Sequence, residues 1–194
     1  MHHIHHTRGF ILESRSVGSA NKLLYIFTRD FGLLMSSAQG LREIHSKLRY
    51  HLEDYTESYL SLVHGKSGWR ITGAEVINQW FHILIPQKMV IVAHVFALLR
   101  RLLVGEEANV PLYNIIESAL GYLKDLPNDL RTLSAFETLL VLRILHNLGY
   151  IGEMNLEAFT KEPVAWNETF LTHILEERQR AIAHINRALK ESHL

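Results

Sequence analysis

Apolar residues in the first 80 positions occur in short runs that are separated by turn residues. The runs are rich in Ile, Leu, Phe and Tyr, and the gaps between them include Val17-Gly18-Ser19 and Asp30-Phe31-Gly32. The pattern predicts five strands, over residues 7–14, 22–28, 33–40, 55–64 and 69–77, with a longer polar connection over residues 41–54. A small closed barrel suits five short strands because closure removes exposed edges. An OB-like and an SH3-like barrel both fit this pattern.

From Pro86 onward the apolar residues follow the period of helices. Pro86 suits the first turn of a helix, and Gly105 suits the position after its end. The residues between them are apolar almost all round, so we expect this helix to lie at the centre of a helical core. Its polar positions Gln87, His94 and Arg101 are spaced by seven residues and therefore share one face.

Three further helices follow in the pattern. The second extends from about Pro111 to Lys124, and the third ends at Gly149, where a capping glycine belongs. The third begins either at Asn128 or Asp129, or at Ser134, whose partner Glu137 would complete a capping box. A fourth helix follows the N-cap Asn167 and carries at core spacing Leu171, Ile174, Leu175, Ile182, Ile185 and Leu189. The whole pattern predicts an α+β fold, with a barrel domain over residues 1–80 and an all-α domain over residues 81–194.

The amino-acid composition excludes several classes of function for this protein. The 20 basic and 20 acidic residues cancel, so any attraction to nucleic acid must come from a local patch. The absence of cysteine excludes disulfides, thiolate nucleophiles and cysteine-ligated metal sites. The most apolar run, residues 89–99, is shorter than the roughly 20 residues that span a bilayer, and the N-terminus lacks the apolar core of a signal peptide. We therefore expect a soluble cytoplasmic protein without a membrane partner.

Three common catalytic and cofactor-binding motifs are not found in the sequence. It contains no phosphate-binding glycine loop, no nucleophile elbow and no helical His-Glu-x-x-His motif. The adjacent pairs Glu106-Glu107 and Glu176-Glu177 do not converge on one substrate, since neighbouring residues on a helix point apart. We expect a protein that is not an enzyme and that has no cofactor.

Basic residues concentrate near the N-terminus. Residues 1–52 hold seven basic and three acidic side chains, a local charge of +4. With Tyr25, Phe27 and Tyr50, these cations could form a groove that follows a phosphate backbone while bases stack on aromatic rings. The alternative is that Tyr25 and Phe27 fill the barrel and the cations only solvate its surface. The candidate DNA-binding residues are Arg8, Arg15, Lys22, Arg29, Arg42, Ser46, Lys47 and Arg49, of which the last four lie in one polar loop.

An ordered series of short motifs resembles one known family. In the N-terminal half the motifs are Thr7-Arg8-Gly9-Phe10-Ile11-Leu12, Val17-Gly18, Lys22-Leu23-Leu24-Tyr25-Ile26-Phe27-Thr28-Arg29-Asp30-Phe31-Gly32-Leu33, Ala38-Gln39-Gly40-Leu41-Arg42, Ser46-Lys47-Leu48-Arg49 and Ile71-Thr72-Gly73-Ala74-Glu75. In the C-terminal half they are Phe136-Glu137, Leu139-Leu140 and Leu148-Gly149-Tyr150. The series covers about two thirds of the chain and resembles the RecO family of recombination mediators.

The resemblance implies a fold, a function and partners. It implies an OB-fold barrel that binds and anneals single-stranded DNA, and a helical domain that cooperates with RecR and with the single-strand-binding protein to load the recombinase. We expect the acidic C-terminal tail of the single-strand-binding protein to enter an apolar groove of the helical domain, with Arg100, Arg101 and Arg143 as the cations that meet it. The chain departs from the family at Gln39 and Glu43, where basic residues are usual, and it lacks the family's cysteine-rich zinc insertion.

These departures keep a second hypothesis open. The zero net charge, Gln39 and Glu43 also suit a protein-interaction adaptor whose barrel has lost its affinity for nucleic acid. A third hypothesis is a metal-handling or sensory protein, because His2, His3, His5 and His6 are potential ligands for nickel or zinc. An expression tag or a flexible natural terminus explains those histidines better, so we predict no metal site.

Overall fold

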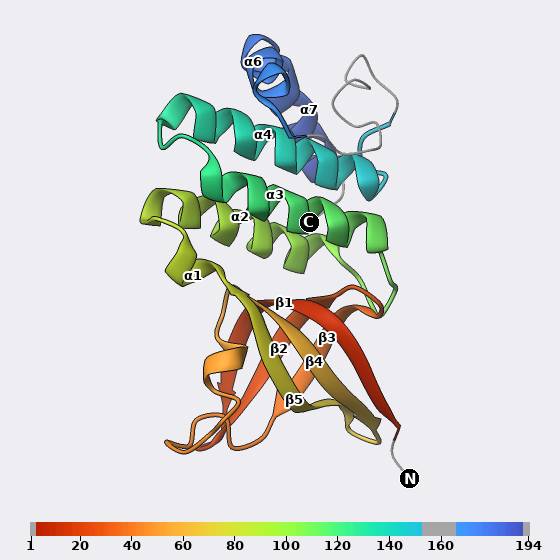
Figure 1. Cartoon of the computed structure of the whole chain (residues 1–194). Coiled ribbons are helices and arrows are strands. Elements are labelled where there is room, and N and C mark those ends of the chain that lie inside the picture. Colours follow the sequence, from red (N-terminus) through yellow and green to blue (C-terminus); the bar gives the residue numbers. More distant parts are fainter. Residues whose placement is uncertain (1–2, 153–165, 192–194) are drawn as a thin grey trace. The chain divides into compact units, whose positions relative to one another are not determined.

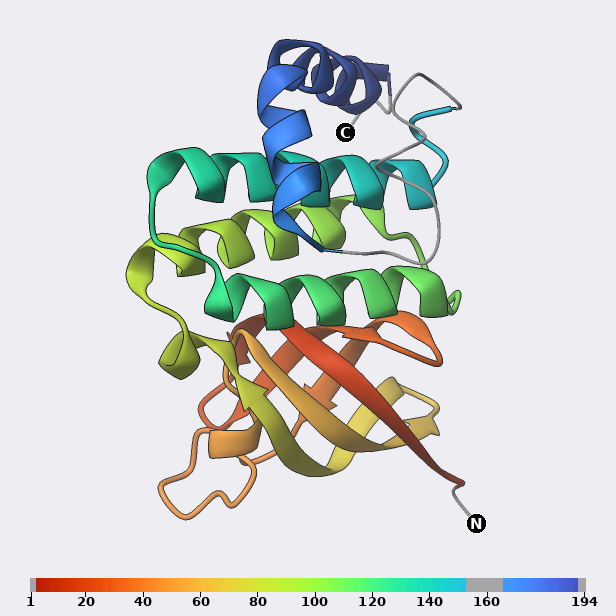
Figure 2. The same ribbon diagram turned by 45° about the horizontal axis from the view of Figure 1, so that its top comes forward.

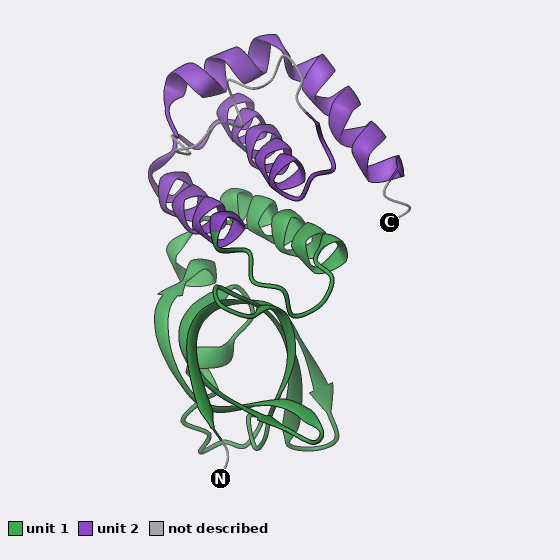
Figure 3. Ribbon diagram, turned by 90° about the vertical axis from the view of Figure 1, so that its right-hand side faces the viewer, with its two compact units in different colours: residues 1–110 green, residues 111–194 purple. Residues whose placement is uncertain are grey.

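The computed structural model describes residues 3–152 and 166–191. The chain divides into two compact units, residues 1–110 and residues 111–194 (Figure 3). Within the described residues, the first unit contains the barrel, a short 3₁₀ helix and two α-helices, and the second contains α-helices and no strand.

The five predicted strands are confirmed. They are β1 (Ile4–Val17), β2 (Asn21–Thr28), β3 (Gly32–Ala38), β4 (Thr56–Gly65) and β5 (Gly68–Gln79) (Figure 1). They close into a barrel in the order β1-β2-β3-β5-β4, and Figure 3 looks along its axis. Neighbouring strands are antiparallel except β3 and β5, which pair in parallel with Ser36 opposite Trp69. This five-stranded barrel followed by helices is the OB-like arrangement.

The alternation of apolar residues fills the barrel. Side chains at every second position of β2 and β4, such as Leu24, Ile26, Leu60 and Leu62, are buried in one hydrophobic cluster. The residues between them face outward, so Tyr25 and Phe27 share the outer face of β2. The polar connection between β3 and β4 runs through consecutive turns and ends in a short 3₁₀ helix, η1 (Tyr50–Leu52).

Two helices belong to the barrel unit. The change from strand to helix falls at Gln79, where β5 passes into α1 (Trp80–Ile83), and α2 (Pro86–Leu102) follows. The ring of Phe96 on α2 lies 5.9 Å from that of Phe10 on the outer face of β1. Helix α2 thus groups with the barrel, and the boundary between the compact units falls at residue 110, about 30 residues beyond the change from strands to helices. The predicted polar positions of α2 are exposed.

The second unit consists of α3 (Val110–Asp125), α4 (Leu130–Asn147), α6 (Glu168–Glu176) and α7 (Arg178–Glu191) within the described residues. The open choice at the start of α4 is settled, because the Asp129 carboxylate accepts a hydrogen bond from the backbone N–H of Thr132 at 2.8 Å. Ser134 instead lies inside the helix. No helix in the described parts of the chain has the length and apolarity that crossing a membrane requires.

The predicted fourth helix is wrong in one respect. Asn167 does cap its start, accepting a hydrogen bond from the N–H of Phe170 at 2.9 Å. The helix ends at Glu176, however, with Glu177 as its C-cap, and α7 leaves it at an angle (Figure 2). The Arg178 guanidinium, at the start of α7, donates to the Ser134 hydroxyl at 2.6 Å. In α7 the fully covered residues are Ala181 and Ala188, while the larger apolar residues that we expected in the core are half-buried.

Candidate nucleic-acid interface

The outer face of strands β1, β2 and β3 brings cations, an aromatic ring and exposed apolar residues together. In the register of these strands Tyr25 lies opposite Glu13 on one side and Met35 on the other. The next outward positions are Arg15 on β1 and Leu23 on β2, which also face each other. Met35 is 56% exposed, so it adds apolar surface beside Tyr25.

Two arginines lie beside Tyr25. The guanidinium carbons of Arg15 and Arg100 are each 5.3 Å from the centre of the Tyr25 ring, within the range of cation–π attraction. One carboxylate holds both cations. Glu13 Oε1 accepts from Arg15 Nε at 2.8 Å, and Glu13 Oε2 pairs with Arg100 Nη1 at 2.6 Å. The hydrogen bond to Glu13 raises the pKa of Arg15, so this guanidinium stays charged.

Two further predicted cations lie at the β1–β2 hairpin. Lys22 Nζ donates to the Ser14 hydroxyl at 2.9 Å. Arg42 Nη1 donates to the carbonyl oxygen of Gly18, also at 2.9 Å, so the long loop after β3 is tied to the hairpin loop. Farther along this loop Lys47 and Arg49 are exposed and Ser46 is half-buried. The structure thus places Arg15, Lys22 and Arg42 on or beside one hairpin.

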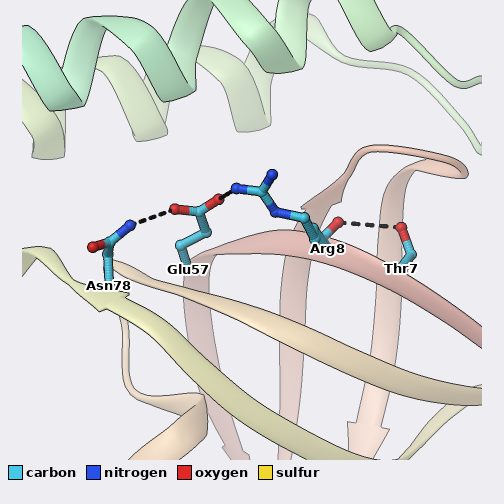
Figure 4. A network of polar contacts seen from close by, with 4 residues as sticks. All are labelled: Thr7, Arg8, Glu57 and Asn78. Atoms are coloured by element: carbon cyan, nitrogen blue, oxygen red, sulfur yellow. Dashed lines mark hydrogen bonds and ion pairs between the residues drawn. The ribbon is translucent and has the colours of Figure 1, made fainter.

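Arg8 and Arg29 belong to a different part of the barrel. Arg8 Nη2 pairs at 2.6 Å with Glu57, whose side chain is 0% exposed (Figure 4). Asn78 donates to the second carboxylate oxygen of Glu57 at 2.9 Å. The guanidinium of Arg8 also lies 5.9 Å from the ring of Tyr59 on β4. Arg29 is next to Asp30, with 3.6 Å between their charged atoms. The eight predicted DNA-binding residues therefore do not line a single groove.

The aromatic residues of the barrel also differ in how far their rings are exposed. Phe27 is fully buried, so it offers no ring for stacking, but it lies on the outer face of β2 and does not fill the barrel as the alternative interpretation expected. Tyr50 is exposed, and Tyr25 is half-buried beneath its two arginines. Tyr59, which is 55% exposed, was not among the predicted residues. Its position opposite Arg8 depends on the register of β1 and β4, which the sequence does not reveal.

The three arginines predicted to bind a partner differ in their surroundings. Arg100 contacts the barrel, as described above. Arg101, one residue further along α2, is exposed. Arg143 is 3% exposed, and its guanidinium lies 4.2 Å from the ring of Trp166 and 5.6 Å from that of Phe170. Arg100 and Arg101 belong to the first compact unit and Arg143 to the second.

An apolar groove of about 540 Å³ lies beside the start of α2. Its lining residues are Tyr55, Phe81, Leu84, Pro86, Met89, Val90 and Ala93. Arg100 and Arg101 lie toward the other end of α2, roughly 15 Å from Val90 along the helix axis. These two arginines therefore do not rim this groove.

The N-terminal histidines were the candidates for metal binding. His2 lies outside the described residues. His5 packs against the rings of Phe31 and Trp69, at 5.4 and 5.3 Å. Among the residues that the structure describes, no three histidine or acidic side chains are grouped as a metal ion would require.

A closed OB-like barrel followed by helices defines the class of this protein. Residues 1–80 match the family model described as "Recombination protein O N terminal". The chain is 29% identical over 163 residues to the DNA repair protein RecO of Heliobacterium modesticaldum, a match that covers 83% of this chain and 57% of the relative. It is 30% identical over 115 residues to that of Dehalococcoides mccartyi, covering 59% and 46%, respectively. The N-terminal barrel of this chain is thus similar to the N-terminal domain of the RecO family. The chain spans about half the length of the curated relatives that it matches.

Proposed function

We propose that this protein is a DNA-repair mediator that binds single-stranded DNA, without sequence preference, on the outer face of β1, β2 and β3. The observation that carries the proposal is the cluster of Tyr25 with Arg15 and Arg100, whose guanidinium carbons each lie 5.3 Å from the centre of the ring. It combines the two features that sequence-tolerant binding of single strands needs, an aromatic ring for bases and cations for phosphates. The names of the relatives, DNA repair protein RecO, support the same role.

The face has the layout of a binding surface for a flexible strand. Exposed Met35 and Val17 extend the apolar surface around Tyr25. Lys22 and Arg42 lie at the hairpin on one side, and Lys47 and Arg49 follow in the exposed loop. Stacking contributes about 1–3 kcal/mol per base, and each phosphate that a cation neutralises adds affinity by releasing counterions. Such a surface binds without making or breaking bonds, so we propose a role without catalysis or cofactor.

The partners follow from the family. We propose that the protein anneals complementary strands in the cytoplasm and loads the recombinase together with RecR and the single-strand-binding protein. The acidic tail of the single-strand-binding protein requires an apolar slot and a reachable cation. Arg101 has the most exposed side chain of our three candidates, because Arg100 is paired with Glu13 and Arg143 is covered by aromatic rings. Calorimetry with the tail peptide tests this choice: Arg101→Ala should weaken binding, and unchanged affinity would exclude Arg101.

Binding of a labelled oligonucleotide at several salt concentrations tests the DNA-binding proposal. Each phosphate contact should contribute a slope of about −0.7 to log K against log salt. Changing Arg42, Lys47 and Arg49 together to alanine should make the slope less steep by up to about 2, since three contacts are lost. A matched control changes Lys124, Arg131 and Arg187, three cations of the second unit, and should keep the slope of the wild type. A wild-type affinity that is undetectable at low salt, or that ignores salt, contradicts the proposal.

A protein-interaction adaptor is the second candidate function. Glu13 neutralises one of the two charges that flank Tyr25, and Gln39 and Glu43 are exposed beside the basic loop. The apolar groove beside α2 also suits a protein segment better than nucleic acid. An adaptor would bind its protein partners with full affinity while the oligonucleotide assay gives no salt-dependent signal.

A further inference from the structure

A second groove crosses strands β1, β4 and β5 of the barrel. Its volume is about 560 Å³, and its lining includes Arg8, Arg29, Tyr59, Ser61, Gly73 and Glu75. Along β1, Arg8 and Glu13 lie on opposite sides of Phe10, which packs against Phe96 of α2. The segment of the barrel that α2 covers therefore separates this groove from the face around Tyr25.

The floor of the groove is made of small residues. Ser61 on β4 lies opposite Gly73 on β5, so the strands are bare of large side chains at this point. A Cβ atom added to Gly73 would lie 3.4 Å from the Cβ and Oγ atoms of Ser61, which neither packing nor backbone geometry forbids. The floor is therefore open because of the residue types present, and a larger side chain at position 73 would fill the groove without disturbing the barrel core.

One end of the groove carries an aromatic ring beside a fixed cation. Tyr59 lies opposite Arg8 on β1 and opposite Glu75 on β5. The guanidinium of Arg8, 5.9 Å from the ring, is anchored by the buried carboxylate of Glu57, which Asn78 also binds. This anchor fixes the cation beside Tyr59 before any ligand arrives, so a ligand would not have to order it.

The opposite side of the groove comes from the turn between β2 and β3. The side chain of Arg29 is 43% exposed there and lies 3.6 Å from Asp30. Asp30 is itself held by the hydroxyl of Thr7, which donates to it at 2.7 Å. The lining of the groove thus combines two cations, Arg8 and Arg29, with three hydrogen-bond acceptors, Asp30, Ser61 and Glu75.

This chemistry matches one nucleotide better than a simple anion or an apolar peptide. A nucleobase presents a flat ring to Tyr59 and an edge with both donors and acceptors, which Ser61 and Glu75 can meet. Its phosphate can reach the exposed guanidinium of Arg29. The carboxylates of Asp30 and Glu75 oppose a bare polyanion, and the polar lining does not suit an apolar segment. From this geometry we propose that the groove is a second nucleobase-stacking site for single-stranded DNA, separate from the face around Tyr25.

Photo-crosslinking tests this site together with the proposed function on which it rests. The probe is a short oligothymidylate, about six nucleotides long and within the range that OB folds bind, in which one base is 5-iododeoxyuridine. With the full chain, mass spectrometry of the digest should identify crosslinks at both Tyr59 and Tyr25. A crosslink at Tyr25 without one at Tyr59 overturns the second site and leaves the proposed function standing. A crosslink at Tyr59 alone supports the second site and overturns our choice of the first face, and no crosslink at either tyrosine overturns both.

Three substitutions measure the contribution of the groove. Tyr59→Ala should lower the affinity for a longer oligonucleotide by about fivefold or more, the equivalent of about 1 kcal/mol or more per stacked base. Tyr59→Phe keeps the ring and should bind like the wild type. Gly73→Val should lower the affinity as Tyr59→Ala does, because it fills the floor while leaving the ring in place. Unchanged affinity in both Tyr59→Ala and Gly73→Val would overturn the proposal, and this is the result expected if the groove instead receives a protein segment.

Discussion

Two tyrosines on the outside of the barrel are each accompanied by arginines, but the arginines are held in different ways. At Tyr25 two guanidiniums share the carboxylate of Glu13, which is 33% exposed. At Tyr59 a single guanidinium is tied to Glu57, whose carboxylate is fully buried. Exposed ion pairs contribute little to stability, whereas a buried charge depends on its partner. The first arrangement can therefore change without cost to the fold, and the second is part of the structure itself.

The largest expected effect is on stability. Arg8→Ala removes the cation that neutralises buried Glu57 and should lower the free energy of unfolding by about 3 kcal/mol or more, because an unpaired buried charge remains. Arg15→Ala removes the corresponding partner of exposed Glu13 and should change the free energy of unfolding by less than about 1 kcal/mol. Urea denaturation of the two variants measures the difference. Equal stabilities would contradict the contrast between the two pairs.

A smaller effect is expected on DNA affinity when the exposed carboxylate loses its charge. Glu13→Gln can still accept hydrogen bonds from Arg15 and Arg100, but it leaves one more positive charge available on the face around Tyr25. The affinity for single-stranded DNA should rise at low salt, with a slope steeper by about 0.7 if one further phosphate is neutralised. Fluorescence anisotropy at a series of salt concentrations follows both quantities. A fall in affinity would show that the charge of Glu13 is needed to hold the arginines in place.

The smallest effect is expected on the pH dependence of stability. It comes from a third carboxylate, that of Asp129, which is exposed and accepts a hydrogen bond from the backbone. The hydrogen bond from the N–H of Thr132 lowers the pKa of Asp129 from its ordinary value of 3.8. A lowered pKa in the folded state means that the stabilisation is fully present above pH 3.8 and is lost as the pH falls through the folded pKa. Asp129→Asn also caps helices well but does not titrate, so its stability should fall less on acidification than that of the wild type. Denaturation at neutral pH and near pH 3 compares the two proteins, and identical losses would contradict this role of Asp129.

Much of the barrel could be predicted because local patterns determine it. Alternation in β2 places Leu24 and Ile26 inside, and the glycine-containing turns mark where strands end. The same alternation gives Tyr25 and Phe27 identical environments, since they share one face. The structure separates them, because Phe27 is fully buried whereas Tyr25 is half-buried beside Arg100, which lies on α2 about 75 residues later in the chain. A contact so distant in sequence has no local signal.

The arginines of the barrel and the C-terminal helices also have features that local sequence patterns could not predict. The charges of Arg8 and Arg15 look alike in sequence, but the register of β1 gives one a buried partner and the other an exposed one. In the C-terminal segment the helical period continues through Glu177, so the pattern predicts one helix where there are two. The hydrogen bond from Arg178 to Ser134 joins α7 to α4, and the periodicity within one helix cannot reveal a bond between two helices.

The most direct test of the central claim is the affinity of Tyr25 variants for single-stranded DNA. Tyr25→Ala removes the ring beside Arg15 and Arg100 and should weaken binding by about fivefold or more at fixed salt, while Tyr25→Phe keeps the ring and should bind as the wild type does. Because Tyr25 lies on the outer face, both variants should remain folded, which circular dichroism verifies. An affinity of Tyr25→Ala equal to that of the wild type would contradict the claim that this face binds DNA.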